Sequence, residues 1–204
     1  MGDSSTAPRK RPKQERSRAT VERILAAGQR CLAEHGYEGT STNRIADAAG
    51  ISPGSLYQYF PNKDAVVVAV IDRFTDALTA QIARDLAARL DQPPAQAVRT
   101  TIESLLDALD VHPEFVRVAF EQTERLQYGR KLAAFEHRIE ELTTAYLLLH
   151  GDRSRSAAER EAAVWIVVRA VGDLTVRYAL ERPEISREDF LSAFTRLVLA
   201  YFPE

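Results

Sequence analysis

Residues 51–60, "ISPGSLYQYF", combine hydrogen-bonding side chains with a proline and a glycine at the start of a short helical segment. Tyr57 and Tyr59 can each direct a hydroxyl group at a phosphate. Ser55 and Gln58 carry small hydrogen-bonding groups of the kind that meet base edges in a DNA major groove. Such contacts need a helix that is held rigidly, so the neighbouring elements matter.

Residues 41–50, "STNRIADAAG", predict a short preceding helix, with Ser41 or Thr42 as its N-cap and Gly50 as its end. Ser52 is a suitable N-cap for the next helix, with Pro53 in the first helical position, where its missing N–H costs nothing. We expect that helix to run to Phe60, because Pro61 disfavours helical geometry in the residue before it.

The two short helices predict a helix-turn-helix. At 100° per residue, Leu56 and Phe60 share the inner side of the second helix, while Gly54 and Gln58 point outward. Small residues at 53–55 allow a close approach to a duplex, and backbone N–H groups there can meet phosphate. Lys63 adds a cation on the same side. From this geometry alone, a plain helical corner without DNA binding remains an equal alternative.

Helical periodicity continues along the rest of the chain and no run reads as a strand, so we predict an all-α fold of about nine helices. The first helix ends at Gly36, and Asn62 caps a long fourth helix that reaches Leu90. A capping box from Ser186 to Asp189 opens the last helix. We divide the chain into a disordered basic leader (1–14), a three-helix DNA-binding domain (15–65) and a larger helical effector-binding and dimerisation domain (66–204).

The composition fits a cytoplasmic protein. Cys31 is the only cysteine, which excludes an intrachain disulfide and a cysteine-built zinc site. No apolar run is long enough for a membrane span, and no signal peptide is evident. Over residues 1–65, ten Lys and Arg face seven Asp and Glu, a surplus of three positive charges in a chain of net charge −2.

The positive excess lies in the leader and just after it, where the Lys and Arg residues from Arg9 to Arg18 face only Asp3 and Glu15. A solvated tail is one interpretation, and an arm that follows the DNA backbone or enters a minor groove is the other. In the second case, deletion of residues 1–14 weakens operator binding and flattens its salt dependence.

Residues 36–72, "GYEGTSTNRIADAAGISPGSLYQYFPNKDAVVVAVID", resemble the DNA-binding signature of the TetR/AcrR family of bacterial regulators. The resemblance implies DNA-backbone contacts from Thr42, Tyr57, Tyr59 and Lys63, with Tyr59 in place of a frequent histidine. It implies base contacts from the first of the two short helices, through Asn43 or Arg44, and from the second, through Pro53, Gly54, Ser55 and Gln58. Ser52 is the N-cap of that second helix. For Arg44, a solvated helix charge is an equal alternative.

The same resemblance implies a homodimer formed by the last two helices. Their apolar surface supports this, although simple core helices are the alternative; the candidate interface residues are Trp165, Val168, Val171, Tyr178, Phe190, Phe194, Leu197 and Tyr201. A two-fold dimer reads an imperfect palindrome with half-sites about 34 to 36 Å apart.

A small-molecule pocket is also implied, and its candidate residues are Phe115, Phe120, Glu121, Tyr128, Phe135 and His137. An aromatic stripe at helical spacing is more often core than pocket. Arg169 and Asp173, four positions apart, are expected to pair with each other or across the dimer interface.

We therefore expect a ligand-responsive transcriptional regulator, a repressor, that binds a palindromic double-stranded DNA operator as a homodimer. An unknown effector would move the long fourth helix and release the operator. We expect no cofactor, no metal and no enzymatic activity, because no HExxH, GxSxG or P-loop pattern occurs. A helical interaction module and a helical enzyme without DNA binding are the alternatives, and salt-sensitive duplex binding separates them.

Overall fold

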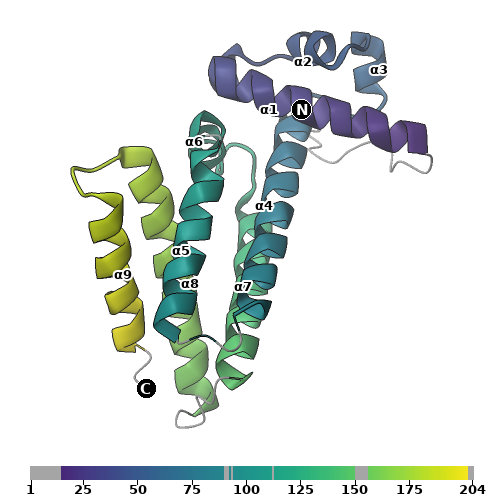
Figure 1. The fold of residues 1–204 in the computed structure, drawn as a ribbon. Coiled ribbons are helices and arrows are strands. Elements are labelled where there is room, and N and C mark those ends of the chain that lie inside the picture. The colour runs from purple at the N-terminus through teal and green to yellow at the C-terminus, as the bar shows by residue number, and fades with distance from the viewer. Residues whose placement is uncertain (1–14, 90–91, 93, 112, 150–155, 202–204) are drawn as a thin grey trace. The chain divides into compact units, whose positions relative to one another are not determined.

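The computed structural model describes residues 15–89, 92, 94–111, 113–149 and 156–201. Within these ranges it contains nine α-helices and no strand, which confirms the predicted fold class (Figure 1). The described residues form two compact units: one from 15–75 and 113–130, the other from the described parts of 76–111 and 131–201. The predicted basic leader lies outside the described residues.

The first unit is built around α1 (Glu15–Gly39), which packs against α2 (Thr42–Ala49) and α6 (Pro113–Glu121). It also contains α3 (Pro53–Tyr57), which packs against α2, and the first half of α4 (Lys63–Ala87). Its largest fully buried side chains come from all of these helices and from the turn after α3: Ile24, Leu32, Ile45, Leu56, Phe60, Val66, Val67, Val70 and Phe115.

The helix ends follow the local sequence signals. Gly36 interrupts α1 with φ 64° and ψ −176°, a backbone region that is essentially restricted to glycine. The Ser41 hydroxyl accepts from Arg44 N at 3.2 Å, and Gly50 ends α2 in the left-handed region. The Asn62 side chain accepts from Ala65 N at 2.8 Å at the start of α4. These predicted caps are confirmed.

Helix α3 is shorter than predicted. It ends at Tyr57 rather than Phe60, because the chain tightens into a turn: both Tyr59 N and Phe60 N donate to the Leu56 carbonyl, at 2.9 and 3.0 Å. Its N-terminus is as predicted, since Ser52 Oγ accepts from Ser55 N at 3.1 Å and Pro53 takes the first position.

Residues 113–130 belong to the same compact unit as the helix-turn-helix, and the division into functional domains stays a prediction. Phe115 is fully buried and meets Phe74 edge-to-face, with ring centroids 5.5 Å apart. The Tyr128 hydroxyl donates to Asp72 at 3.0 Å. These contacts join segments that are about 40 to 55 positions apart, so the chain order conceals them.

The second unit contains the rest of α4, α5 (Pro94–Asp110), most of α7 (Gly129–Leu149), α8 (Ala157–Glu181) and α9 (Arg187–Tyr201). Helix α5 packs against both α8 and α9. An apolar core fills the α5–α9 contact, with Ile102, Leu106, Leu191, Phe194 and Val198. The capping of Asp189 N by Ser186 Oγ, at 3.1 Å, confirms the predicted start of α9.

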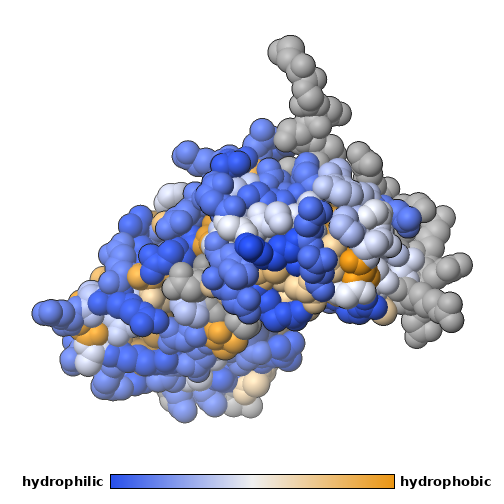
Figure 2. Space-filling view, turned by 90° about the horizontal axis from the view of Figure 1, so that it is seen from above, coloured by the Kyte–Doolittle hydropathy of each residue, from blue (hydrophilic) through white to orange (hydrophobic). Residues whose placement is uncertain are grey.

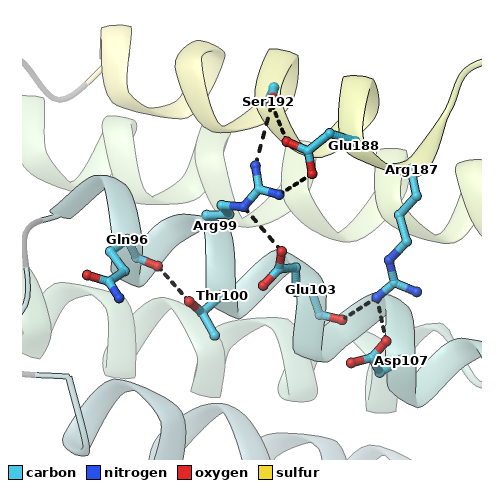
Figure 3. A network of polar contacts seen from close by, with 8 residues as sticks. All are labelled: Gln96, Arg99, Thr100, Glu103, Asp107, Arg187, Glu188 and Ser192. Atoms are coloured by element: carbon cyan, nitrogen blue, oxygen red, sulfur yellow. Dashed lines mark hydrogen bonds and ion pairs between the residues drawn. The ribbon is translucent and has the colours of Figure 1, made fainter.

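Ion pairs at the start of α9 complete the α5–α9 contact (Figure 3). Arg99 of α5 reaches Glu188 at 2.5 Å and Glu103 at 3.2 Å. Arg187 pairs with Asp107 and Asp110 of α5. These contacts fix one side of α9 on its own protomer.

Among the helices in the described ranges, none is long and apolar enough to cross a membrane. The described side chains also include no cluster of three or more His, Cys, Asp or Glu residues that could hold a metal ion.

Candidate nucleic-acid interface

Helix α3 and the turn that follows it are fastened to the first unit by inner side chains and present small polar groups on the outside. Leu56 is fully buried and Phe60 is 2% exposed. Gly54 and Gln58 are exposed, and Tyr57 is 42% exposed. The division between inner and outer positions is the one that the helical geometry predicts.

The hydroxyl groups of Thr42 and Tyr57 lie 2.9 Å apart and form a hydrogen bond. Thr42 is the first residue of α2, where backbone N–H groups lack partners within the helix. Two hydroxyls and a helix N-terminus thus lie together at the surface, a combination that binds anionic oxygens well. The structure brings together two residues for which backbone contacts are predicted.

Ser55 is half-buried, and its hydroxyl lies 2.9 Å from that of the N-cap Ser52. Both can still accept or donate a further hydrogen bond, because a hydroxyl has one donor and two acceptor sites. Pro53 beside them is exposed, and with Gly54 it leaves the start of α3 narrow.

Lys63 lies against the backbone and ring of Tyr37. Its Nζ donates to the Tyr37 carbonyl at 2.8 Å and lies 4.0 Å from the ring centroid. Arg125, from the segment after α6, lies 4.8 Å from the same centroid and pairs with Glu38 at 3.3 Å. A lysine ammonium has three N–H donors, so its contact with Tyr37 leaves capacity for a phosphate.

The Tyr37 hydroxyl is bonded to Asp64 in the first turn of α4. Burial, and then this hydrogen bond and the negative charge of Asp64, raise the pKa of Tyr37 to about 12. The tyrosine is therefore neutral at physiological pH.

The remaining predicted DNA-contacting residues differ in their surroundings. Asn43 is exposed, whereas the Arg44 guanidinium donates to the Gly39 carbonyl at the end of α1. Tyr59 is half-buried. The roles of all these residues at DNA stay predictions.

Two arginines of α1 that the sequence patterns do not single out contact the end of α2. Arg23 donates to the Ala49 and Gly50 carbonyls, and Arg30 donates to the Ala48 carbonyl at 3.1 Å. The partners are 18 to 27 positions apart. Periodicity and capping rules relate residues only a few positions apart, so they do not predict contacts at these sequence separations. The only signal in the sequence is the presence of arginines on an amphipathic helix.

The predicted effector residues fall into both units. Phe115 and Tyr128 are buried in the first unit, whereas Phe120 is 47% exposed and Glu121 is exposed. In the second unit, Phe135 is half-buried, and exposed His137 lies near Glu140 and Glu141. The six residues are thus divided between the two units, and a pocket formed by any of them stays a prediction.

The predicted dimer residues also differ in exposure. Trp165 is 54% and Leu197 is 59% exposed, whereas Phe194 is 4% exposed and lies in the core of its own protomer. Partly buried residues pack against that core: Val171, Tyr178 and Phe190, with Tyr178 and Phe190 stacked at 4.1 Å. Val168 is half-buried, and the Tyr201 side chain lies outside the described set.

The expected pair of Arg169 with Asp173 within α8 is wrong, whereas the alternative, a pair across the dimer interface, stays a prediction. Arg169 instead reaches from α8 to Glu136 and Glu140 of α7, and Asp173 pairs with Arg177 at 2.8 Å. Two carboxylates on the facing helix give Arg169 stronger partners than one carboxylate on its own helix.

Hydrophilic residues predominate on the face of the molecule that Figure 2 shows. A capped pair of short helices, joined by a glycine turn and backed by a buried core, is the architecture of a helix-turn-helix motif, whose second helix enters the major groove in DNA-binding proteins.

Comparison with known proteins identifies the family. The family described as "Bacterial regulatory proteins, tetR family" matches residues 24–70, and "Tetracyclin repressor-like, C-terminal domain" matches residues 93–202. The chain therefore belongs to the TetR family of bacterial transcriptional regulators.

Individual relatives agree with this assignment. The uncharacterized HTH-type transcriptional regulator Rv1255c of Mycobacterium tuberculosis is 29% identical over 152 residues, which are 74% of this chain and 73% of the relative. FadR of Thermus thermophilus, a TetR-family repressor solved with lauroyl-CoA, aligns with a TM-score of 0.65 and 22% identity over 90% of this chain and 95% of its own. The fatty acid degradation regulator FadR of Bacillus halodurans aligns with a TM-score of 0.67 and 16% identity over 93% and 97%.

Proposed function

We propose that this TetR-family regulator is a repressor that binds a palindromic operator as a homodimer and leaves it when a small molecule binds the second unit. The observation that carries the proposal is the hydrogen-bonded pair of Thr42 and Tyr57 at the N-terminus of α2, beside the exposed face of α3. It supplies a phosphate-binding group next to a narrow helix that fits a major groove.

The contacts divide into two kinds. Thr42, Tyr57, Tyr59 and Lys63 bind phosphates and set the height of α3 over the groove, which contributes affinity for any sequence. Base reading falls on the outward groups of α3 and of the start of α2, with Ser52 as the cap that holds the first turn of α3: Asn43, Arg44, Pro53, Gly54, Ser55 and Gln58.

The proposed dimer uses α8 and α9. One side of α9 is occupied by the apolar core and by the ion pairs to α5, while Leu197 faces away at 59% exposure. On α8, Trp165, Ile166 and Leu174 are 40% to 54% exposed. Burial of such surfaces against a second copy contributes about 25 cal/mol per Å², which favours association through these two helices.

The proposed effector site lies in the second unit. Thr175 is fully buried and Thr195 is 8% exposed, yet neither hydroxyl has a hydrogen-bond partner among the described residues. A buried polar group without a partner costs about 1 to 3 kcal/mol, and a polar ligand group would remove that cost. Phe135 and His137 belong to the same unit. Since FadR of T. thermophilus was solved with lauroyl-CoA, acyl-CoA thioesters are the first class to test.

Selection of binding sites from a random duplex pool tests the DNA part of the proposal. We expect an imperfect palindrome with half-site centres about 10 base pairs apart. Tyr57→Phe should lower affinity similarly on all sequences, and Gln58→Ala should relax one base position at a cost of about 1 to 3 kcal/mol. Gln96→Ala, an exposed glutamine of the second unit, is the matched control.

Effector titration against the selected operator, with lauroyl-CoA and shorter thioesters, then tests release. Absence of salt-sensitive duplex binding would overturn the proposal and favour a helical interaction module or enzyme. Duplex binding that no added compound weakens would overturn the effector part alone.

A further inference from the structure

The end of α2 is held by a side chain from outside the helix-turn-helix. Arg23 of α1 donates from Nη2 to the Ala49 carbonyl at 2.7 Å and to the Gly50 carbonyl at 3.1 Å. Its Nε donates to the Ala49 carbonyl at 3.2 Å. One guanidinium thus covers two consecutive carbonyls at the point where the chain leaves α2.

These carbonyls are the ones that a helix leaves without internal partners, and the negative end of the helix dipole favours a cation there. Helix α2 has only eight residues and has little stability of its own. The planar, forked guanidinium fixes the direction of both carbonyls, which a single ammonium group cannot do.

The direction of the Gly50 carbonyl sets the start of α3. Gly50 is left-handed, with φ 64° and ψ 41°, and Ile51 N donates back to the Ala46 carbonyl at 3.0 Å. Only Ile51 and the N-cap Ser52 separate Gly50 from Pro53, the first residue of α3. With five residues, α3 can correct an error in that direction only through the buried Leu56 and through Phe60 in the turn that follows it.

We propose that Arg23 is a positioning residue for operator recognition: it sets the angle between α2 and α3 through the Ala49 and Gly50 carbonyls, and so determines where the outward side chains of α3 meet the bases. This inference rests on the proposed operator binding. Its consequence is that loss of Arg23 reduces discrimination between operator and random duplex, since phosphate contacts tolerate a small rotation of α3 better than base contacts do.

The test compares Arg23→Gln and Arg23→Lys with Arg73→Gln in the full chain. Arg73 of α4 donates to Gln29 at 2.7 Å and to Glu22 at 3.4 Å, so its variant removes comparable bonds to α1 in the same unit without touching α2. Fluorescence anisotropy with labelled operator and random duplex, over a range of salt, gives the affinity ratio and the salt slope. Peptide-level hydrogen exchange over residues 51–60 needs no DNA.

For Arg23→Gln we expect about a tenfold loss of operator affinity, the size of one lost base contact. Random-duplex affinity should stay within about twofold, with an unchanged salt slope, because the number of phosphate contacts is the same. Arg23→Lys should lose less operator affinity than Arg23→Gln, because lysine keeps the positive charge at the end of α2. Hydrogen exchange over residues 51–60 should rise in Arg23→Gln and stay as in the native chain in Arg73→Gln.

Three results would overturn the inference. Equal losses on both duplexes with a salt slope lower by about one would make Arg23 a phosphate ligand. The same loss of discrimination in Arg73→Gln would make the effect general destabilisation. Unchanged exchange over residues 51–60 in Arg23→Gln would remove the link to α3, whether or not the chain binds DNA. If the native chain fails to bind duplex DNA while that exchange rises, the operator proposal fails and the role of Arg23 in holding α3 remains.

Discussion

Replacement of Phe115 by alanine tests whether α6 belongs to the folded core of the DNA-binding unit. Phe115 is fully buried and packs edge-to-face on Phe74. A Phe→Ala change in such a site costs about 3 to 5 kcal/mol, of which the aromatic pair accounts for about 0.5 to 1.5 kcal/mol. Phe120, five positions later on α6, is 47% exposed. Its replacement should cost less than about 1 kcal/mol.

Hydrogen exchange followed by mass spectrometry measures the two effects locally. We expect Phe115→Ala to speed exchange in α1 and α6 peptides by roughly a hundredfold or more, the equivalent of about 3 kcal/mol. Phe120→Ala should change it by less than about fivefold. Trp165 is the single tryptophan and lies in the second unit. Its fluorescence at low denaturant should be the same in both variants, which shows that the second unit stays folded.

Equal exchange in the two variants would refute the packing account of α6. Loss of effector response in Phe115→Ala with native exchange would instead restore Phe115 to the effector pocket, the role that its place in an aromatic stripe suggests. The pair of variants therefore separates a core residue from a ligand contact.

Three further outcomes follow from the structure. Gly50→Asn should lower the free energy of unfolding by less than about 1 kcal/mol, because asparagine tolerates the left-handed region. Gly36→Asn should lower it by more than about 1 kcal/mol, because ψ −176° with positive φ is essentially restricted to glycine. Urea denaturation measures both free energies. Burial alone would raise the pKa of Asp85, but hydrogen bonds from Arg89, Gln81 and Ser104 lower it below its ordinary value. Its contribution to stability is thus present above the unfolded pKa and is lost as the pH falls through the folded pKa, so Asp85→Asn should flatten acid denaturation between about pH 5 and 2 as followed by circular dichroism. Leu197→Glu should convert the proposed dimer into a monomer in sedimentation velocity, while Ala193→Glu, at an exposed position one turn earlier on α9, maps how far the interface extends.

Sequence patterns predicted the parts of the fold that depend on neighbours within about four positions. The caps at Ser41, Ser52 and Asn62, and the stop at Gly50, are of this kind, because a cap bonds a backbone group two or three residues away. The inner and outer faces of α3 follow from its period in the same way. Local chemistry was therefore sufficient to place the helix-turn-helix.

Contacts between distant segments were not predictable in this way. A buried phenylalanine such as Phe115 carries no signal that distinguishes an effector pocket from a core shared with α1, because both environments favour an apolar side chain. Likewise, Arg23 is identifiable only after α1 and α2 have been packed together, since its partners lie 26 and 27 positions away. The family resemblance does not supply these side-chain contacts either.

The shortness of α3 links the proposed operator binding to the stability of the first unit. Five residues do not form a stable helix alone. Helix α3 can therefore bind DNA only while Leu56 stays buried and Arg23 of α1 holds the end of α2. Apparent affinity equals the intrinsic affinity multiplied by the fraction of competent molecules. A perturbation smaller than the local stability leaves that fraction near one and the affinity almost unchanged.

The same relation limits how the proposed effector can act. The segment 113–130 packs with α1, and the chain continues from it into α7 of the second unit. Helix α4 also connects the two units, because its first half belongs to one and its second half to the other. If the binding free energy of the effector loosens the α1–α6 contact, the operator is released only when that energy exceeds the stability of the contact. This stability is about 3 kcal/mol if the burial of Phe115 determines it. Weakening this contact by a partial truncation, Phe115→Leu, should then lower the effector concentration needed for release while the affinity for operator without effector stays within about twofold. An unchanged effector concentration would assign release to α4 alone.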